Sequence, residues 1–139
     1  MSTETNNASP LRCIVVTPEK TVLDGEATFV ALPLYDGEVG IAHNHSPMIG
    51  RLGFGEMRIR SGSDTSHYYV DGGFVQVADN LVSVLTNRAI PSAAVDGAAA
   101  QALFDSAMSR KSAGDEQIAL RARALTQARA QLRIARRPK

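Results

Sequence analysis

Disulfides, tryptophan and long apolar runs are missing from this 139-residue sequence, which has one cysteine and no tryptophan. A single cysteine cannot form an intrachain disulfide, so a disulfide-stapled secreted scaffold is excluded and a reducing compartment is favoured. No segment approaches the ~20 apolar residues that cross a bilayer. The polar residues 1–10 have neither the apolar core of a signal peptide nor the arginines of a transit peptide. We therefore expect a protein that does not span a membrane.

Motifs for catalysis or cofactor binding are also lacking. Gly53-Phe54-Gly55 is not followed by the third glycine of a dinucleotide fingerprint, and no Gly-Lys-Ser/Thr sequence forms a phosphate loop. His43, His45 and His67 are too few for a metal site with supporting carboxylates. Cys13, inside an apolar run, is interpreted as a buried hydrophobe. Because no nucleophile, base and oxyanion donors can be assembled, we predict a protein that is not an enzyme and that holds no metal or cofactor.

The formal net charge of +1 conceals an uneven distribution of charge along the chain. Residues 1–90 have ten acidic and six basic side chains, a net charge of −4, whereas residues 91–139 have nine basic and four acidic ones, a net charge of +5. From Gln117 to Lys139 there are seven basic residues and no acidic one. Exposed helices usually mix charges of both signs, so this segment is expected to bind an anionic partner.

Three partners would compensate this charge: nucleic acid, anionic lipid, or an acidic protein surface. Nucleic acid is disfavoured because the basic segment has no interleaved aromatics and no recognisable binding motif. Lipid insertion is disfavoured because its apolar stripe has no tryptophan or phenylalanine. An acidic protein is the favoured partner.

The first 90 residues have the pattern of an all-β domain. Nine of the eleven glycines and six of the seven aromatic residues lie there, and apolar residues recur with a period of two between short turn sequences. The expected strands are Leu11–Val16, Thr28–Leu32, Met57–Ile59, Tyr68–Val70, Phe74–Val77 and Leu81–Leu85. We predict an unstructured extension over residues 1–10, a β-sandwich or barrel over 11–90, and a helical domain over 91–139.

The last part is predicted to be a helix hairpin. Ser92 is the expected N-cap of a first helix that runs to about Lys111, and Asp96 would lie near its first turn. Gly114 and Asp115 would end this helix and cap the second one. The second helix would pack through Ile118, Ala122, Leu125, Ala128, Leu132 and Ala135. The first would meet it through Val95, Ala98, Ala99, Ala102 and Ser106. Such small side chains bury little area, so we expect the hairpin to dock on another surface or to change conformation.

Eight short motifs follow one another in a fixed order along the chain. They are Thr17–Lys20, Gly25-Glu26, Leu32-Pro33, Asp36–Ile41, His45–Pro47, Leu52–Gly55, Gly72–Val77 and Asn80–Leu85. This ordered set, together with the two-part layout, resembles the epsilon subunit of bacterial F-type ATP synthase over about residues 11–135. The resemblance implies a mainly β protein with an α appendage: a ten-stranded β-sandwich followed by two antiparallel helices.

The resemblance also implies a function. The chain would be a non-catalytic rotor subunit in the central stalk of a proton-translocating ATP synthase, peripheral to the cytoplasmic face of a bacterial plasma membrane. Its sandwich would bind the gamma subunit and rest on the ring of c subunits. Glu38, in the Gly-Glu-x-Gly turn, is expected at the c-ring. Thr17 and His45 match positions that are expected near gamma.

In many family members the two helices extend toward the alpha/beta catalytic head and oppose ATP hydrolysis. The resemblance therefore implies that four arginines contact acidic segments of the beta subunit: Arg121, Arg123, Arg129 and Arg133. Some members bind ATP through an aliphatic-Asp-x-x-Arg-Ala motif, whose counterpart here is Val95–Ala100. Ala99 stands where that motif has arginine, so we expect no ATP site of this kind. Without the resemblance, two readings stay open: a β-sandwich adaptor, or a nucleic-acid-binding module, each with a basic helical tail.

Overall fold

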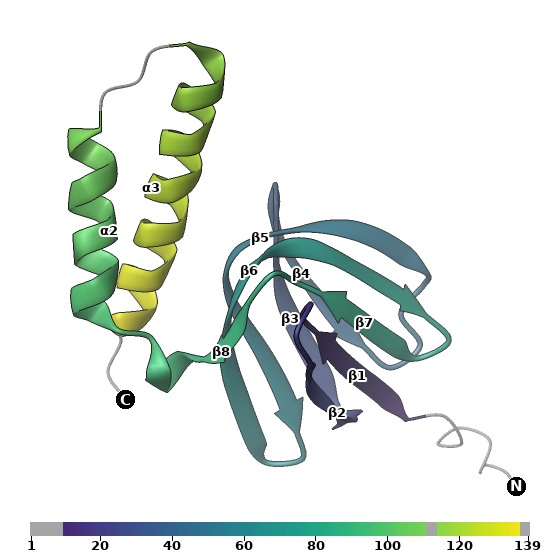
Figure 1. The fold of residues 1–139 in the computed structure, drawn as a ribbon. Helices are drawn as coiled ribbons and strands as arrows, with labels where there is room; N and C mark the ends of the chain where they lie inside the picture. Colours follow the sequence, from purple (N-terminus) through teal and green to yellow (C-terminus); the bar gives the residue numbers. More distant parts are fainter. Residues whose placement is uncertain (1–9, 111–113, 137–139) are drawn as a thin grey trace, which may run out of the picture.

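The computed structural model describes residues 10–110 and 114–136, so the extension expected over 1–10 lies almost entirely outside the described residues. Figure 1 shows a β-sandwich with a helix hairpin on one side. Within the described part, eight strands follow one another: β1 (Leu11–Val16), β2 (Thr21–Ala27), β3 (Phe29–Leu34), β4 (Gly37–Ala42), β5 (Met48–Ser61), β6 (Asp64–Ala78), β7 (Leu81–Leu85) and β8 (Ala89–Pro91). They pair in the order β2-β1-β7-β6-β5-β3-β4, and β8 pairs with β6. The predicted mainly β class with two C-terminal helices is confirmed.

The expected count of ten strands is wrong, because β5 and β6 are single strands of 14 and 15 residues. They pair in one antiparallel register from Met48 opposite Val77 to Ser61 opposite Asp64. The short runs expected at 57–59, 68–70 and 74–77 are therefore parts of these two strands. Long strands that bend can serve both layers of a sandwich, which lowers the number of separate strands.

The predicted turn at Asp71-Gly72-Gly73 is a bend inside β6. Gly72 and Gly73 have φ values of +70° and +112°, a region that side chains with a Cβ rarely adopt. A Cβ on Gly73 would also lie 1.9 Å from the Leu85 carbonyl oxygen. Glycine lets the strand change direction here without losing its pairing, and a turn signal in sequence does not distinguish such a bend from a loop.

The sandwich core follows from the period of two. Leu11, Cys13 and Val15 of β1 are buried, as are Val82 and Val84 of β7, which pairs in parallel with β1. The same core contains Val30 and Leu32 of β3, Met57 and Ile59 of β5, and Val75 and Val77 of β6. Cys13 is fully buried, which confirms its interpretation as a small hydrophobe.

After β8 come a 3-10 turn (Ser92–Ala94) and two helices, α2 (Gly97–Ser109) and α3 (Asp115–Ala135). Ser92 was the expected N-cap of the first helix, but Asp96 caps it, accepting hydrogen bonds from the backbone N–H groups of Ala98 (2.9 Å) and Ala99 (3.2 Å). Asp115 is the first residue of α3 rather than its cap, and Gly114 precedes it with φ of +87°. The predicted end near Lys111 lies outside the described residues.

The seam between α2 and α3 differs from the expected one. Its α2 side consists of Ala100, Leu103, Phe104 and Ala107, which have the i, i+3, i+4, i+7 spacing of one helix face. Four of the five residues that were expected on this side of the seam lie in α2, and all four are exposed: Ala98, Ala99, Ala102 and Ser106. In α3, Leu125 and Ala128 are buried as expected, but Ile118 is exposed. The larger Leu103 and Phe104 bury more apolar area than alanine, which explains why the helix turns them inward.

The hairpin docks on the sandwich through the C-terminal half of α3. Ala130 and Ile134 pack with Tyr69 of β6 and with Val95, and Phe54 and Ile90 border this cluster. Val95, expected in the helix seam, thus belongs to the contact with the sandwich. The two helices together are here called the arm (residues 97–135).

Candidate interaction surfaces

One face of the sandwich exposes large apolar side chains. The strand pairing shows which of these side chains are neighbours. Leu85 of β7 lies opposite Phe74 of β6, and Phe74 lies opposite Arg51 of β5. Ile49 is two residues from Arg51 and so points to the same side. The Arg51 guanidinium lies 4.4 Å from the centre of the Tyr35 ring, which adds this tyrosine to the row. We call this surface the outer face; its exposed apolar members are Tyr35, Ile49, Phe74 and Leu85.

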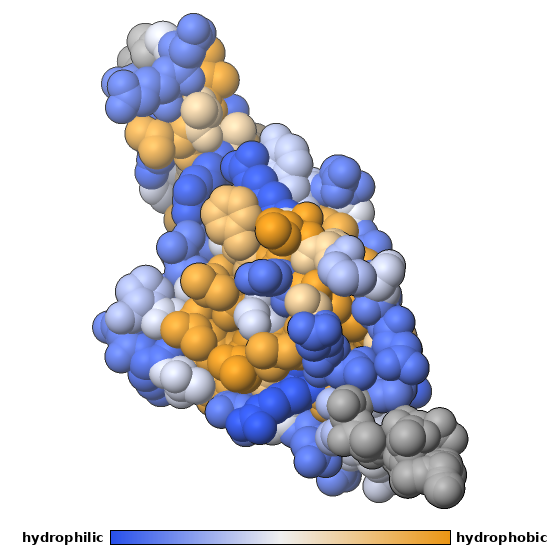
Figure 2. Space-filling view, turned by 90° about the vertical axis from the view of Figure 1, so that its right-hand side faces the viewer, coloured by the Kyte–Doolittle hydropathy of each residue, from blue (hydrophilic) through white to orange (hydrophobic). Residues whose placement is uncertain are grey.

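The outer face exposes more contiguous apolar area than the surface of a soluble monomer usually does. Its members are 70%, 76%, 58% and 55% exposed, in the order just given. Figure 2 shows hydrophobic residues gathered in the middle of one side of the sandwich and surrounded by hydrophilic ones. Tyr35, Phe74 and Leu85 also line an open groove of about 1460 Å³ whose other wall is α3, with Ala119, Ala122 and Arg123. Contiguous apolar surface of this kind marks a site for a protein partner.

Thr17 and His45, expected near one partner, lie in different parts of the sandwich. Thr17 follows β1, lines the groove, and its hydroxyl donates to the Lys20 carbonyl at 3.3 Å. His45 lies in the loop before β5, and its backbone N–H donates to the Ala42 carbonyl at 3.2 Å. The neighbouring Asn44 N–H donates to the Asn80 side chain at 2.6 Å, which fixes the loop against the turn between β6 and β7. The structure therefore does not bring the two residues together: Thr17 borders the groove, and His45 lies in a separate loop.

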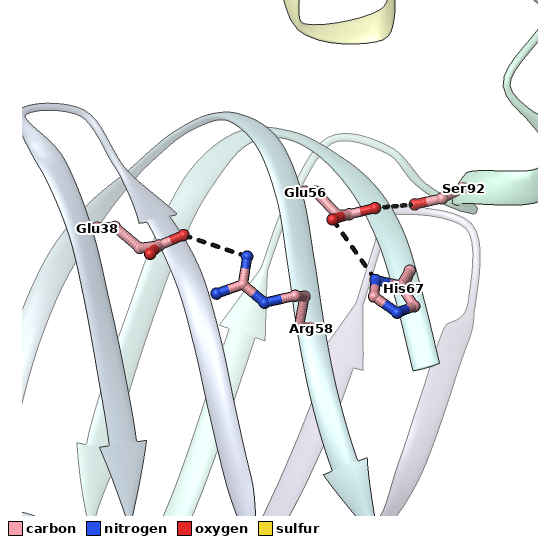
Figure 3. A network of polar contacts seen from close by, with 5 residues as sticks. All are labelled: Glu38, Glu56, Arg58, His67 and Ser92. Carbon is pink, nitrogen blue, oxygen red and sulfur yellow. Dashed lines mark hydrogen bonds and ion pairs between the residues drawn. The ribbon is translucent and has the colours of Figure 1, made fainter. Parts of the chain in front are cut away.

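Glu38 lies elsewhere, on β4 at the edge of the sheet. Its carboxylate is 3.6 Å from Nη1 of Arg58 on β5, and both side chains are exposed (Figure 3). An exposed pair of this kind contributes little to stability, so the carboxylate is available to a partner.

A second carboxylate joins the sandwich to the segment before the arm (Figure 3). The Glu56 side chain is only 6% exposed; the Ser92 hydroxyl donates to it at 2.9 Å, and Nδ1 of His67 lies 3.5 Å away. Here the carboxylate lies between serine and histidine, whereas activation of a serine nucleophile needs the histidine in the middle. The group therefore anchors Ser92 and has no catalytic arrangement. Among the described residues, no group of three or more His, Cys, Asp or Glu side chains could hold a metal.

The four arginines expected on one face of the arm have different surroundings. Arg121 turns to the end of α2, where its Nε donates to the Ala107 carbonyl at 2.9 Å. Arg123 lies over the ring of Phe54 in the sandwich, at 5.4 Å, whereas Arg129 lies over Phe104 of α2, at 6.0 Å. Arg129, Arg133 and Arg136 line a hollow of about 490 Å³ together with Gln101 and Phe104. A helix advances 100° per residue, so positions 121 and 123 cannot share a face.

The contact between the arm and the sandwich contains polar groups that the sequence did not reveal. Asp71 of β6 is buried, and both of its carboxylate oxygens accept hydrogen bonds from Nε2 of Gln127 on α3, at 2.8 and 3.1 Å. Tyr69, two residues earlier, is fully buried. Burial raises the pKa of its hydroxyl to about 12.

No helix of the described residues is both long and apolar enough to cross a bilayer.

Comparison with known proteins agrees with this architecture. A family model described as "ATP synthase, Delta/Epsilon chain, beta-sandwich domain" matches residues 10–92. The ATP synthase epsilon chain of Rhodopirellula baltica is 48% identical over 126 residues, which cover 91% of this chain and 98% of that protein. The epsilon chain of a Synechococcus strain is 43% identical over 93 residues, covering 67% of this chain and 68% of its own length.

Two solved structures share the fold. One is the mitochondrial ATP synthase of Euglena gracilis with its F1 and c-ring, where the TM-score is 0.80 at 20% identity over 91% of this chain and 81% of the matched one. The other is the central stalk and c-ring of the Tetrahymena thermophila mitochondrial enzyme, with a TM-score of 0.72 at 14% identity over 89% and 95% of the two chains. The family model and the close bacterial relative together show that this chain belongs to the family of ATP synthase epsilon chains, which are non-catalytic subunits.

Proposed function

We propose that the protein is a rotor subunit of the central stalk of a proton-translocating ATP synthase, where it links the gamma subunit to the c-ring. The observation that carries this proposal is the outer face, an exposed row of Tyr35, Ile49, Phe74 and Leu85. The solved neighbours are parts of ATP synthase assemblies that contain a c-ring, which supports the same partnership. In a bacterium this assembly places the protein at the cytoplasmic face of the plasma membrane, as a peripheral subunit.

The outer face is the proposed docking surface for gamma. Aromatic side chains in the centre of an interface contribute most of its binding energy, and Phe74 lies in the middle of the row between Leu85 and Arg51. Arg51, stacked on Tyr35, offers a guanidinium at the same surface. Thr17, at the rim of the groove, and His45, in the loop before β5, would contact gamma as well.

Glu38 is the proposed contact with the c-ring. It lies on the edge strand β4, whereas the outer face is formed by β5, β6 and β7 together with Tyr35 of the turn between β3 and β4. A subunit that transmits rotation must bind two partners at once, so two separate surfaces on one rigid sandwich suit the task. The pairing of Glu38 with Arg58 keeps its carboxylate at the surface in a defined position.

The arm is the proposed brake on ATP hydrolysis. When it leaves the sandwich, α3 with its 21 residues would reach about 30 Å along the stalk toward the catalytic head. Arg121, Arg123, Arg129 and Arg133 would then meet acidic segments of the beta subunit. The local charge of the arm supports this partner, because no acidic residue follows Glu116.

The docking surface can be tested with Phe74→Asp. A charge in the middle of an apolar interface has to be desolvated without a partner, so we expect binding to isolated gamma subunit to weaken by at least about 30-fold, the size of a hot-spot loss. Ser66→Asp adds the same charge at an exposed position of the same strand and should leave binding unchanged. Isothermal titration calorimetry measures both. Equal affinity of Phe74→Asp and the unaltered chain for gamma would rule out the outer face as the docking surface.

A further inference from the structure

The contact between the arm and the sandwich has a fixed carboxylate at its centre. The backbone of Asp71 is held by the connection from β7 to β8: its N–H donates to the Thr86 hydroxyl and to the Arg88 carbonyl, both at 3.1 Å. The Asn87 side chain donates to the Asp71 carbonyl at 3.3 Å, and the Thr86 hydroxyl donates to Arg88 at 3.2 Å. Asp71 lies inside β6, directly before the bend glycines Gly72 and Gly73, and all of these backbone bonds are made within the sandwich, so the position of its backbone does not depend on the arm.

Gln127 is the arm's partner for this carboxylate. Its Nε2 donates hydrogen bonds to both Asp71 oxygens, and Gln127 lies on α3 between the part that meets α2 and the part that packs on Tyr69. A hydrogen bond to a charged and buried acceptor is stronger than one between neutral groups. Departure of the arm would break this bond and return Asp71 to water.

The buried hydroxyl of Tyr69 acts against docking of the arm. Its hydroxyl is buried beneath the arm and has no hydrogen-bond partner within ordinary distance and angle among the described residues, although Gln131 and Asp71 lie next to it. A buried hydroxyl without a partner is costly, and departure of the arm would let water satisfy it. The apolar contact around it is small, with Val95, Ala130 and Ile134 as its other buried members.

We propose that Asp71, Gln127 and Tyr69 together set the balance between a docked and a released arm. The Asp71–Gln127 bond is a latch that favours docking, and the unsatisfied Tyr69 hydroxyl favours release. Because the two effects act in opposite directions, a partner that binds the released arm has to supply less free energy than the Asp71–Gln127 bond alone would require. The biological use of this latch rests on the braking role proposed for the arm, but the latch itself is a property of the isolated chain.

Spin labels at Ser63→Cys and Leu120→Cys report the separation of sandwich and arm by pulsed electron paramagnetic resonance at pH 8. Both positions are exposed, and native Cys13 is fully buried and stays unlabelled. Gln127→Ala should raise the ratio of released to docked arm by about 10- to 100-fold, the size of one lost hydrogen bond to a charged group. Gln127→Glu places two carboxylates against each other and should raise it further. Ala102→Glu adds the same charge at an exposed position of α2 and should leave the ratio unchanged.

Two rescues separate the latch from general damage. Asp71→Asn combined with Gln127→Glu exchanges donor and acceptor, so an amide of residue 71 donates to a carboxylate at 127 and docking should return. Tyr69→Phe, added to Gln127→Ala, removes the unsatisfied hydroxyl and should lower the released fraction by about tenfold. A docked distance distribution in Gln127→Glu identical to that of the unaltered chain would overturn the latch, as would failure of the exchanged pair to restore docking.

The same variants distinguish the latch from the proposed brake. In the assembled enzyme, release of the arm by Gln127→Glu should lower the rate of ATP hydrolysis. The exchanged pair, Asp71→Asn with Gln127→Glu, should restore the rate of the unaltered enzyme. If the labels show release while hydrolysis stays constant, the latch stands and the braking role is wrong. If the labels show no release, the latch is wrong whatever the hydrolysis rate.

Discussion

Cys13 and Tyr69 are two weak acids that the fold keeps protonated. Cys13 is fully buried among the valines and leucines of the sandwich core, and burial raises the pKa of its thiol to about 12. Burial raises the pKa of Tyr69 to the same value. In both cases the ionised form would have to enter an apolar environment, which explains why the thiolate, the reactive form of cysteine, is suppressed at neutral pH.

These two residues predict a loss of stability at alkaline pH. Cys13 and Tyr69 ionise near 9.0 and 10.0 in an unfolded chain and near 12 in the folded one. Between pH 9 and 12 the unfolded chain therefore releases protons that the folded chain keeps, and the free energy of unfolding falls as pH rises. The stabilisation is complete below pH 9. Urea titrations from pH 8 to pH 12 measure how steeply the free energy of unfolding falls with pH.

Cys13→Ala provides the control for this slope. It removes the ionisable group and leaves a small cavity that lowers stability at every pH by a similar amount, about 1 kcal/mol. The decline should then begin near pH 10, with Tyr69, rather than near pH 9. An unchanged slope between pH 9 and pH 10 would show that Cys13 is not the group responsible.

At the scale of elements, Arg121 closes the open end of the helix hairpin. Its guanidinium donates to the carbonyls of Ala107 (2.9 Å) and Met108 (3.5 Å) in the last turn of α2, where the Ala107 carbonyl also accepts the backbone N–H of Arg110 at 3.4 Å. A cation at the C-terminus of a helix also interacts favourably with its dipole. Arg121 therefore does for the end of α2 what Asp96 does for its start.

Replacement of Arg121 by alanine should loosen the last turn of α2. We expect a loss of about 1 kcal/mol from the missing hydrogen bonds and dipole contact. Hydrogen exchange measured by mass spectrometry should show faster exchange at residues 105–109 and little change in the sandwich. Arg123→Ala, two positions along the same helix, removes the same charge without touching α2 and should leave this exchange unaltered. Equal exchange in both variants would contradict the capping role.

Local signals predicted β1, β7 and the two helices, missed β2, β4 and β8, and predicted tertiary contacts poorly. β1 and β7 have the predicted bounds because each alternates apolar and polar positions between clear turns. β5 and β6 were divided in the prediction because glycines at a bend resemble glycines at a turn. The helix seam was displaced because alanine fits both a seam and a surface. Asp71 and Gln127 are 56 residues apart and no local pattern connects them, and the outer face appears only once Phe74 and Leu85 are paired across strands.

At the scale of the whole molecule, a rigid sandwich with two partner surfaces supports an arm of opposite charge. The net charge is −4 over residues 1–90 and +5 over residues 91–139. In the docked state two cations of the arm are turned toward rings: Arg123 toward Phe54 of the sandwich and Arg129 toward Phe104 of the arm itself. A guanidinium over a ring keeps its edges free for other acceptors. The arm can therefore leave the sandwich and bind an acidic protein surface, where carboxylates would pair with its guanidinium groups.

This exchange predicts which arginines matter for inhibition of ATP hydrolysis. Arg121 is occupied at the end of α2, and Arg123 lies on the side of α3 that faces the sandwich, whereas Arg129 and Arg133 flank a hollow open to solvent. In the assembled enzyme, Arg129→Glu with Arg133→Glu should weaken inhibition by about 100-fold or more, because each of the two interfacial charge pairs contributes about 1.5 kcal/mol or more at close range. Inhibition by the unaltered arm should also weaken as salt rises, and the double variant should lose that dependence. Arg12→Glu with Arg60→Glu makes the same change of charge on the sandwich and should preserve both inhibition and its salt dependence. Hydrolysis rates of the arginine variant that match the unaltered enzyme at every ionic strength would exclude these residues from contact with the catalytic head.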